Sequence, residues 1–314
     1  ATYFREFLRA HMKTWINDEN NIKPYGSKYN LNTDGLKIYT TINYSMQEMA
    51  ENAVLTHMPR LQKEFFEQNE TLDDSIAPFR ELTSGAVDTL LRISMRRSER
   101  WRKMKYDLKK DNEEIEESFF VPKEMTVFSW EGEIDTIMTP LDSMKYYKSF
   151  FRPGMMSMDP TNGYIKAWVG GMNYRHFQYD MVKKGKRQIG STFKPFVYAA
   201  AIDQLKLSPC DTFPDSQFCI EKNKFGNVEQ WCPKNSGDKY GRTRTLKNAL
   251  ANSVNTVTAR LMDRIGPRTV VKLAKDLGIE QRILPVPSIA LGTPDLSVYE
   301  MVAAYSTFAN KGVY

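Results

Sequence analysis

The chain has 314 residues, enough for one large domain or two ordinary ones and for a substantial hydrophobic core. Hydrophobic residues make up 41% of it and charged residues 26%, which is typical of a globular protein and excludes a low-complexity chain. The formal net charge of +6 is a mild excess that indicates no particular partner, and we expect no nucleic acid. There is no apolar run of 18 or more residues, so we expect no membrane-spanning helix within the chain.

The first part of the chain, residues 1–35, is predicted to form a helical lead-in and a turn-rich linker. The alternation in "LKIYTTI", residues 36–42, predicts a strand, and "NYSMQEMAENAVLTHM" has the apolar spacing of a helix with Asn43 as its N-cap. From about 59 to 118 the chain is charged and helical in pattern, and this region resembles an insertion. A lipid or polyanion contact is one interpretation of its basic block, and local pairing with the acidic block that follows is the simpler one.

The middle of the chain contains two hairpin patterns. "FVPKEMTVFSWEGEIDTIM" alternates around a turn, and "MMSMDPTNGYIKAWVGG" surrounds a Pro-Thr-Asn-Gly turn. A helix is predicted to begin at Pro140 and another to cover about 191–205. After a loop region at 207–243, two helical faces meet at "NSVN", and two more helices follow. Strands and helices are mixed rather than alternating, which indicates an α+β fold.

Three cysteines, Cys210, Cys219 and Cys232, lie in the loop region. None has the C-x-x-C spacing of a zinc or redox site, and the three histidines are scattered, so we expect no metal and no cofactor. A Cys219–Cys232 disulfide and three free thiols are equal alternatives, because the choice depends on the redox compartment.

The stretch "RQIGSTFKPFVYAAAID" places Ser191 and Lys194 three residues apart on one face at the start of an apolar helix. A serine hydroxyl is a poor nucleophile until a base removes its proton. Lysine is such a base only when it is neutral, which requires burial or nearby positive charge, and the basic run "KKGKR" lies just upstream. An N-cap serine beside a lysine with a solvated end is the plainer alternative.

Two further short patterns help to judge whether Ser191 and Lys194 form a catalytic pair. Ser236 and Lys239 repeat the spacing in a Gly- and Asp-rich loop, where no helix would bring the side chains together, so we reject them. Ser-x-Asn occurs once, as Ser253 and Asn255, between two predicted helices. In a catalytic interpretation, the Ser253 hydroxyl relays a proton and the Asn255 amide holds a substrate peptide bond. The alternative is that either residue only caps the following helix.

Together these segments resemble the transpeptidase domain of class A, bifunctional penicillin-binding proteins, the penicilloyl serine transferases of cell-wall synthesis. The resemblance covers nearly all of the chain outside 59–118, including "GLKIYTTINYSMQEMAENAV", "WCPKNSGDKYGRTRTLKNALANSVNTV" and "ALGTPDLSVYEMVAAYSTFANKGVY". It implies the penicilloyl-serine-transferase fold, an antiparallel sheet flanked by helices. It also implies that 36–314 is a transpeptidase domain with an insertion and that 1–35 is a linker following a glycosyltransferase domain outside this chain.

The resemblance implies a role for each candidate residue. Ser191 would attack the D-Ala-D-Ala carbonyl of a peptidoglycan stem peptide with Lys194 as the base, Ser253 would pass the proton to the departing D-Ala, and Asn255 would bind the substrate amide. An amine from a neighbouring stem peptide would then take the acyl group, and β-lactams such as penicillin would acylate Ser191 stably. A D,D-carboxypeptidase or β-lactamase of the same fold, or a non-catalytic cell-wall scaffold, is the alternative.

One family motif, Lys-Thr/Ser-Gly, is absent from the 314 residues. In the family it follows the "FANKGVY" region and holds the substrate carboxylate. We therefore expect the fold to be incomplete at its C-terminus, with the remaining strands supplied by a missing C-terminal segment of the same protein. The resemblance also implies an N-terminal membrane anchor outside this chain and a location on the extracytoplasmic, periplasmic side of the cell envelope, which favours the cysteine pair.

Overall fold

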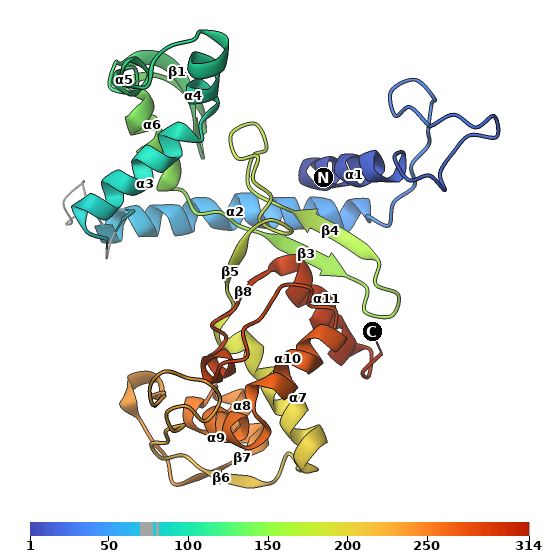
Figure 1. The fold of residues 1–314 in the computed structure, drawn as a ribbon, viewed down its shortest axis with the longest axis vertical. Helices are drawn as coiled ribbons and strands as arrows, with labels where there is room; N and C mark the ends of the chain where they lie inside the picture. Colours follow the sequence, from blue (N-terminus) through green and yellow to red (C-terminus); the bar gives the residue numbers. More distant parts are fainter. Residues whose placement is uncertain (70–77, 80–81, 314) are drawn as a thin grey trace. The chain divides into compact units, whose positions relative to one another are not determined.

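The computed structural model describes residues 1–69, 78–79 and 82–313 and shows helices combined with short antiparallel sheets (Figure 1). The chain divides into two compact units, each built from segments that are separated in the sequence. The first unit consists of Ala1–Gln47, Gly154–Gly170 and Tyr179–Tyr314, and the second of Glu48–Pro153 and Gly171–Gln178. The chain therefore passes from the first unit to the second and back twice.

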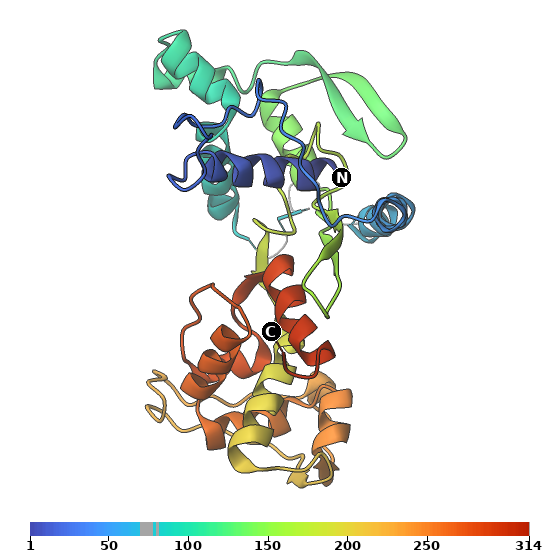
Figure 2. The same ribbon diagram turned by 90° about the vertical axis from the view of Figure 1, so that its right-hand side faces the viewer.

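The first unit has a helical core around α7 (Lys194–Leu205). This helix is apolar on several faces, with Phe196 and Val197 fully buried, so neighbouring elements must cover it on more than one side. The elements that pack on it include α9 (Asn255–Ile265), α10 (Pro267–Asp276) and the 3-10 turn η4 (Pro287–Leu291). Figure 2 shows α7 in yellow among these orange and red elements.

Two short ladders connect the loops of this unit. The strand β5 (Lys186–Gln188) pairs with β8 (Asp295–Ser297), and β6 (Thr212–Pro214) pairs with β7 (Thr243–Thr245), both antiparallel. The helix α8 (Leu246–Ala251) follows β7 directly. These ladders bring the two ends of the long loop region together and fix the segment that precedes α7.

The long loop between β6 and β7 contains a disulfide between Cys219 and Cys232. This is the pairing that the sequence left open. A backbone bridge between Ile220 and Trp231 lies directly inside it. Cys210 is a free, exposed thiol. The loop is therefore covalently closed upon itself.

The predicted hairpin after residue 154 is confirmed as β3 (Met155–Met158) and β4 (Ile165–Val169), which form a two-stranded antiparallel sheet. The helix α1 (Thr2–Trp15) packs on β4, where the rings of Phe7 and Trp168 stack with centroids 4.8 Å apart. The last helix, α11 (Val298–Ala309), packs on β3 and starts with a capping box formed by Ser297 and Glu300. The mixture of helices and antiparallel strands confirms the α+β prediction.

The strand predicted for residues 36–42 is wrong, because this segment has no regular secondary structure. Its apolar side chains Ile38 and Tyr39 are exposed, so the alternating pattern buries no face. Two hydrogen bonds join its end to β4: Thr41 Oγ1 donates to the Ile165 carbonyl at 2.8 Å, and the Asn43 N–H donates to Lys166. A strand requires a continuous backbone ladder, which these two contacts do not provide.

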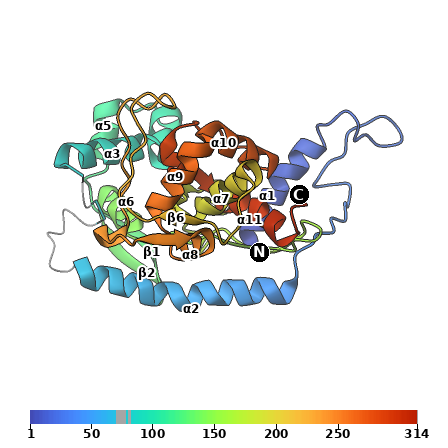
Figure 3. The same cartoon turned by 90° about the horizontal axis from the view of Figure 1, so that it is seen from below.

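The second unit contains the helices predicted for residues 59–118, of which 70–77 and 80–81 lie outside the described residues. The helix α2 (Tyr44–Asn69) begins in the first unit and continues straight through Pro59 (Figure 3). Asn43 caps it as predicted, since its Oδ1 accepts a hydrogen bond from the Met46 N–H at 3.0 Å. The elements that follow are α3 (Ser84–Arg96), α4 (Glu99–Arg102), the π-helical turn η1 (Lys103–Asp107) and α5 (Asn112–Glu117).

The basic and acidic blocks of this unit pair locally. Lys110, the last residue of the basic block, pairs with Glu114 of the acidic block one turn further along the chain, and Arg92, just before the basic block, forms a 2.7 Å ion pair with the half-buried Glu116. These contacts favour the interpretation of a solvated helical surface. Exposed pairs of this kind contribute little to stability, about 0–1 kcal/mol each.

The predicted second-unit hairpin is confirmed as β1 (Lys123–Ser129) paired with β2 (Gly132–Met138). The helix α6 (Pro140–Lys148) begins at Pro140, as predicted, with Thr139 as its cap. Buried aromatic rings of Phe128, Phe150 and Phe177 form a core in this unit. Among the described residues, each helix is either too short or too polar to cross a membrane.

Candidate active site

Ser191 lies on a single 3-10 turn, η2 (Gly190–Phe193), that leads directly into α7. The helix predicted for 191–205 therefore begins as a 3-10 turn and becomes an α-helix at Lys194. Side chains three residues apart align along a 3-10 turn, so Ser191 and Lys194 lie on one side. Ser191 is exposed, whereas Lys194 is only 1% exposed. The result is a buried lysine that follows an exposed serine by one 3-10 turn.

The turn that carries Ser191 is fixed by a backbone contact that requires glycine. The Gly190 N–H donates to the Gly292 carbonyl at 2.9 Å, and the Ile189 N–H donates to the Pro294 carbonyl. A Cβ on Gly292 would lie 1.7 Å from the Gly190 oxygen, which no side chain tolerates. Tyr305 Oη also donates to the Thr192 carbonyl at 2.6 Å. The Ser191 turn is thus held from η4 and α11.

The Lys194 ammonium contacts both members of the Ser-x-Asn motif. Its Nζ donates to the Ser253 carbonyl at 2.6 Å, to Ser253 Oγ at 2.9 Å and to Asn255 Oδ1 at 2.6 Å. Three acceptors therefore satisfy the three N–H groups of the lysine. Within the described residues, the Ser191 hydroxyl makes no side-chain hydrogen bond. Such bonds are often long in unliganded enzymes and shorten when substrate binds, so this geometry does not exclude the pair.

Ser253 has an unusual backbone conformation, with φ of 53° in the left-handed region. It lies in the connection between α8 and α9, where its N–H donates to the Leu250 carbonyl at 3.0 Å. This conformation costs a residue other than glycine on the order of 1 kcal/mol. In return, both its carbonyl oxygen and its hydroxyl face Lys194 Nζ. A strained residue of this kind is typical of functional sites.

Burial lowers the pKa of Lys194 to about 8. The sequence analysis gave nearby positive charge from the upstream run "KKGKR" as a second possible cause of a lowered pKa. Two lysines of this run have other partners: the Lys183 ammonium lies 3.5 Å above the Tyr299 ring centre, and Lys186 bonds Gln281. Burial is thus the physical reason for the lowered pKa of Lys194.

The neutral form of Lys194 must receive a hydrogen bond on its lone pair. Asn255 Oδ1 accepts only, and its orientation is fixed because Asn255 Nδ2 donates to the Lys234 carbonyl at 2.7 Å. A backbone carbonyl likewise accepts only. Of the three partners, Ser253 Oγ alone can reverse its hydrogen bond and donate to the amine. The geometry therefore makes Lys194 and Ser253 a pair between which a proton can pass.

The rejected pair Ser236 and Lys239 lies on the surface of the loop, and both residues are exposed. The sequence analysis missed two other residues, Asp215 and Asn235, which reach the start of α9 from the loop. The sequence shows only that Asn235 follows Cys232 by three residues, in "CPKN".

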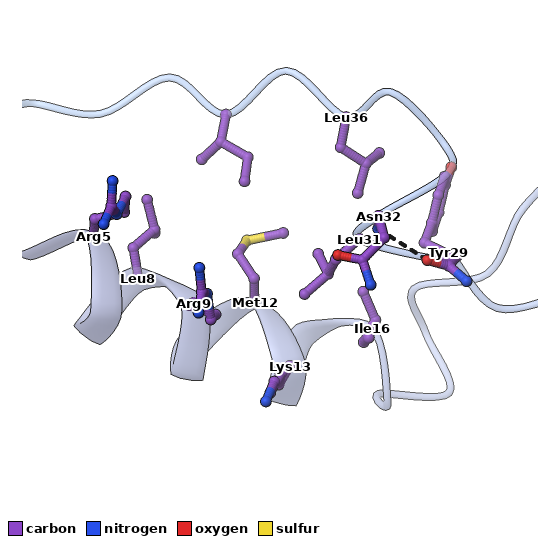
Figure 4. Close-up of a pocket in the computed structure, with 12 residues that line it drawn as sticks. Arg5, Leu8, Arg9, Met12, Lys13, Ile16, Tyr29, Leu31, Asn32 and Leu36 are labelled. Carbon is purple, nitrogen blue, oxygen red and sulfur yellow. Dashed lines mark hydrogen bonds between the residues drawn. The ribbon is translucent and has the colours of Figure 1, made fainter.

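A separate open groove in the first unit has a volume of about 730 Å³. Figure 4 shows Leu8, Met12 and Ile16 of α1 pointing toward Leu36 across it, with Arg9 and Lys13 beside them. Its lining includes none of the four candidate site residues. We assign it no part in the chemistry.

The comparisons with known proteins identify the family. Residues 153–314 match the penicillin-binding protein transpeptidase domain, and residues 74–151 match the penicillin-binding protein middle domain. The first match covers more than half of the chain, so the chain belongs to the penicillin-binding protein transpeptidase family, as the sequence predicted. The middle-domain match starts inside the predicted insertion and extends through β1, β2 and α6. The boundaries predicted for 1–35, 36–314 and 59–118 stay predictions.

Two curated relatives that match the chain are penicillin-binding proteins 1A. Penicillin-binding protein 1A of Aquifex aeolicus is 29% identical over 292 residues, covering 88% of this chain and 37% of that protein. Penicillin-binding protein 1A of Neisseria lactamica is 35% identical over 159 residues, covering 50% of this chain and 20% of that protein. The chain thus spans well under half the length of these relatives.

The fold comparison agrees. The crystal structure of penicillin-binding protein 1A from Haemophilus influenzae matches 99% of this chain and 46% of its own, with a TM-score of 0.61 and 21% sequence identity. At 21% identity, this similarity supports the fold alone.

Proposed function

We propose that this chain carries the acylation machinery of a peptidoglycan D,D-transpeptidase, with Ser191 as the nucleophile. The observation that carries the proposal is the buried Lys194 amine, bonded to Ser253 and Asn255 and placed one 3-10 turn after an exposed serine. Membership of the transpeptidase family supports the substrate class, D-Ala-D-Ala stem peptides, and binding of β-lactams.

Acylation begins when neutral Lys194 takes the proton of Ser191 Oγ. The oxygen then bonds to the carbonyl carbon of the penultimate D-Ala, forming a tetrahedral intermediate. When that intermediate collapses, the carbon–nitrogen bond to the terminal D-Ala breaks, and the leaving nitrogen takes a proton. Ser253 donates this proton and recovers one from the Lys194 ammonium, to which it is already bonded at 2.9 Å. Asn255 holds the substrate amide near the reacting bond.

Deacylation uses the same groups in reverse. An amine from a neighbouring stem peptide attacks the Ser191 ester, its proton passes to Lys194, and Ser191 regains a proton as the cross-link is released. In a D,D-carboxypeptidase or a β-lactamase of this fold, water replaces the amine. Family membership favours the transpeptidase over these two, and the intact Ser191, Lys194, Ser253 and Asn255 set favours an enzyme over a scaffold.

The setting of the reaction follows from its substrate. Stem peptides lie outside the cytoplasmic membrane, so we propose an extracytoplasmic, periplasmic location with an anchor outside this chain. The Cys219–Cys232 disulfide supports an oxidising compartment. A segment of the same protein that carries the Lys-Thr/Ser-Gly motif would hold the substrate carboxylate.

Intact-mass spectrometry of the full-length protein after incubation with benzylpenicillin tests the proposal. We expect one adduct, lost in Ser191→Ala and retained in the matched control Ser236→Ala. Cross-linked product from stem peptides plus an acceptor amine supports the transpeptidase, whereas cleaved monomer or rapid adduct hydrolysis supports the carboxypeptidase or β-lactamase. A folded protein with no adduct would contradict the proposal and favour the scaffold.

A further inference from the structure

The start of α9 is capped by a side chain from a distant loop. The helix has no side-chain cap of its own, since Val254 occupies the N-cap position. Instead, Asn235 Oδ1 accepts hydrogen bonds from the N–H groups of Asn255 at 3.0 Å and Thr256 at 3.2 Å. These are the first-turn N–H groups that a helix leaves without partners. The neighbouring Lys234 carbonyl holds the Asn255 side chain as well.

A buried carboxylate determines which way the Asn235 amide points. Asp215 is completely buried, and its Oδ1 accepts from Asn235 Nδ2 at 2.7 Å and from Thr256 Oγ1 at 2.8 Å. Because the amide nitrogen faces this carboxylate, the amide oxygen must face the helix. Asp215 Oδ2 accepts from Arg244 Nε at 2.6 Å and from the Gly241 N–H at 3.0 Å. All four contacts fix the carboxylate in one position.

The charge state of Asp215 agrees with this role. Burial raises the pKa of the carboxyl, but hydrogen bonds from Arg244, Thr256, Asn235 and Gly241 outweigh burial and lower it. Asp215 follows β6 directly, and Arg244 lies on the paired strand β7, opposite Phe213. The ladder therefore holds the charged pair in register.

We propose that Asp215 and Asn235 are positioning residues for acylation: they hold the start of α9 so that Asn255 and Ser253 stay bonded to the Lys194 amine. The inference rests on the proposed function of Ser191. Neither residue bonds Ser191 or Lys194, and both act through Asn255, whose Oδ1 lies 2.6 Å from Lys194 Nζ. A shift of α9 would change the surroundings of the amine and hence its ability to take a proton.

A purely structural role is the competing explanation, because the disulfide and the β6–β7 ladder already tie the loop together. The pH dependence of acylation distinguishes the two roles. A structural role changes the melting temperature and leaves the titration of Lys194 unchanged. A positioning role changes the acylation rate and its pH dependence together.

The test compares four variants of the full-length protein: Asn235→Ala, Asn235→Asp, Asp215→Asn and the exchange Asp215→Asn with Asn235→Asp. Asn227→Ala, in the same loop and with a side chain bonded only to loop backbone groups, the Glu221 and Glu229 carbonyls and the Phe225 N–H, is the matched control. The measurement is the second-order rate of acylation by a fluorescent penicillin from pH 6 to 10, with melting temperatures in parallel. The exchange restores one amide facing one carboxylate.

We expect the Asn235 single variants to acylate at least about tenfold more slowly, with a shifted pH midpoint, because small displacements of catalytic groups are costly. The exchange should recover most of the rate and the midpoint, and Asn227→Ala should match the wild type. Wild-type rates and midpoints in every variant, whatever the melting temperatures, would overturn the inference. If Asn235→Ala fails to fold, the acylation rate and pH midpoint of the exchange variant are compared with those of Asn235→Asp. Recovery in the exchange variant supports positioning, and no recovery contradicts it.

If the wild type itself is not acylated, the proposed function fails and the positioning role is tested separately. The pH dependence of Lys194 acetylation by acetic anhydride, measured by peptide mass spectrometry, needs no reaction at Ser191. A midpoint that shifts in Asn235→Asp and returns in the exchange supports positioning. An unchanged midpoint in both contradicts it.

Discussion

The two units each contain a hydrogen-bonded cluster around a titratable base, and we propose a catalytic role for only one of them. In the second unit, His176 Nδ1 bonds Tyr147 Oη at 2.9 Å and its Nε2 bonds Glu133 Oε1 at 2.7 Å. Tyr147 Oη also accepts a hydrogen bond from the Phe128 N–H at 3.1 Å. Both ring nitrogens are therefore occupied by groups that stabilise the fold.

The Lys194 cluster in the first unit differs in two ways. Burial depresses the pKa of its amine, so a neutral base exists near physiological pH. Its partner Ser253 carries an exposed, reversible hydroxyl, and the exposed Ser191 lies on the adjoining turn. Under the proposed mechanism, an accessible hydroxyl nucleophile next to the base distinguishes the catalytic cluster, and a chain of hydrogen bonds alone is insufficient.

The largest expected effect comes from a base that cannot lose its proton. Lys194→Arg keeps a positive charge and removes the neutral amine, because guanidinium stays protonated. We expect the acylation rate to fall by about 10²–10⁴-fold, the usual contribution of a general base. Lys184→Arg, the same change at an exposed position, should leave the rate unchanged. Equal rates for both variants would refute the assignment of Lys194.

A smaller effect should follow from disturbing the turn beneath Ser191. Gly292→Ala places a methyl group 1.7 Å from the Gly190 oxygen at a φ of 74°, so the turn must move. We expect a loss of about 2 kcal/mol or more in unfolding free energy, together with slower acylation. Gly163→Ala has a similar φ of 70° in open space and should cost only about 1 kcal/mol. Denaturant titration of both variants measures the difference, and equal losses would contradict the close contact.

The smallest effect on acylation is expected in the second unit. His176→Gln removes one ring contact and should lower the unfolding free energy by about 1 kcal/mol. The acylation rate should stay within about twofold of the wild type, since the two clusters share no hydrogen-bond partner. Acylation assays and thermal melting of the variant check this. A large loss of activity in a folded variant would break the contrast between the clusters.

Local signals in the sequence predicted much of the fold. The Asn43 cap, the start of α6 at Pro140 and both hairpins depend on residues within a few positions of one another. The strand predicted for 36–42 failed because pairing depends on a partner that the pattern does not contain. The disulfide was left open for a different reason, because the choice between a pair and free thiols depends on the redox compartment.

The candidate site divides in the same way. Ser191, Lys194, Ser253 and Asn255 were predicted from short motifs, and the structure brings Lys194 to Ser253 and Asn255. Asn235 and Asp215 were missed because their hydrogen bonds join residues about 20 positions apart in an irregular loop. No periodicity marks such contacts, and only the folded loop reveals them.

The lowered pKa of Lys194 also sets how stability depends on pH. It is about 8 in the folded chain against an ordinary value of 10.5, so between these values the unfolded state binds more protons. The contribution of Lys194 to stability is therefore fully present above pH 10.5 and is lost as the pH falls toward 8. Lys194→Ala should flatten this part of the stability profile.

The most direct test of the account is the pH dependence of Ser191 acylation in the wild type. If burial makes Lys194 the base, the second-order rate should rise with the neutral fraction of an amine whose pKa is about 8 and level off above pH 9. Ser191→Ala provides the background hydrolysis of the β-lactam at each pH. A rate that is flat from pH 6 to 9 would show that another group takes the proton and would contradict the central role of Lys194.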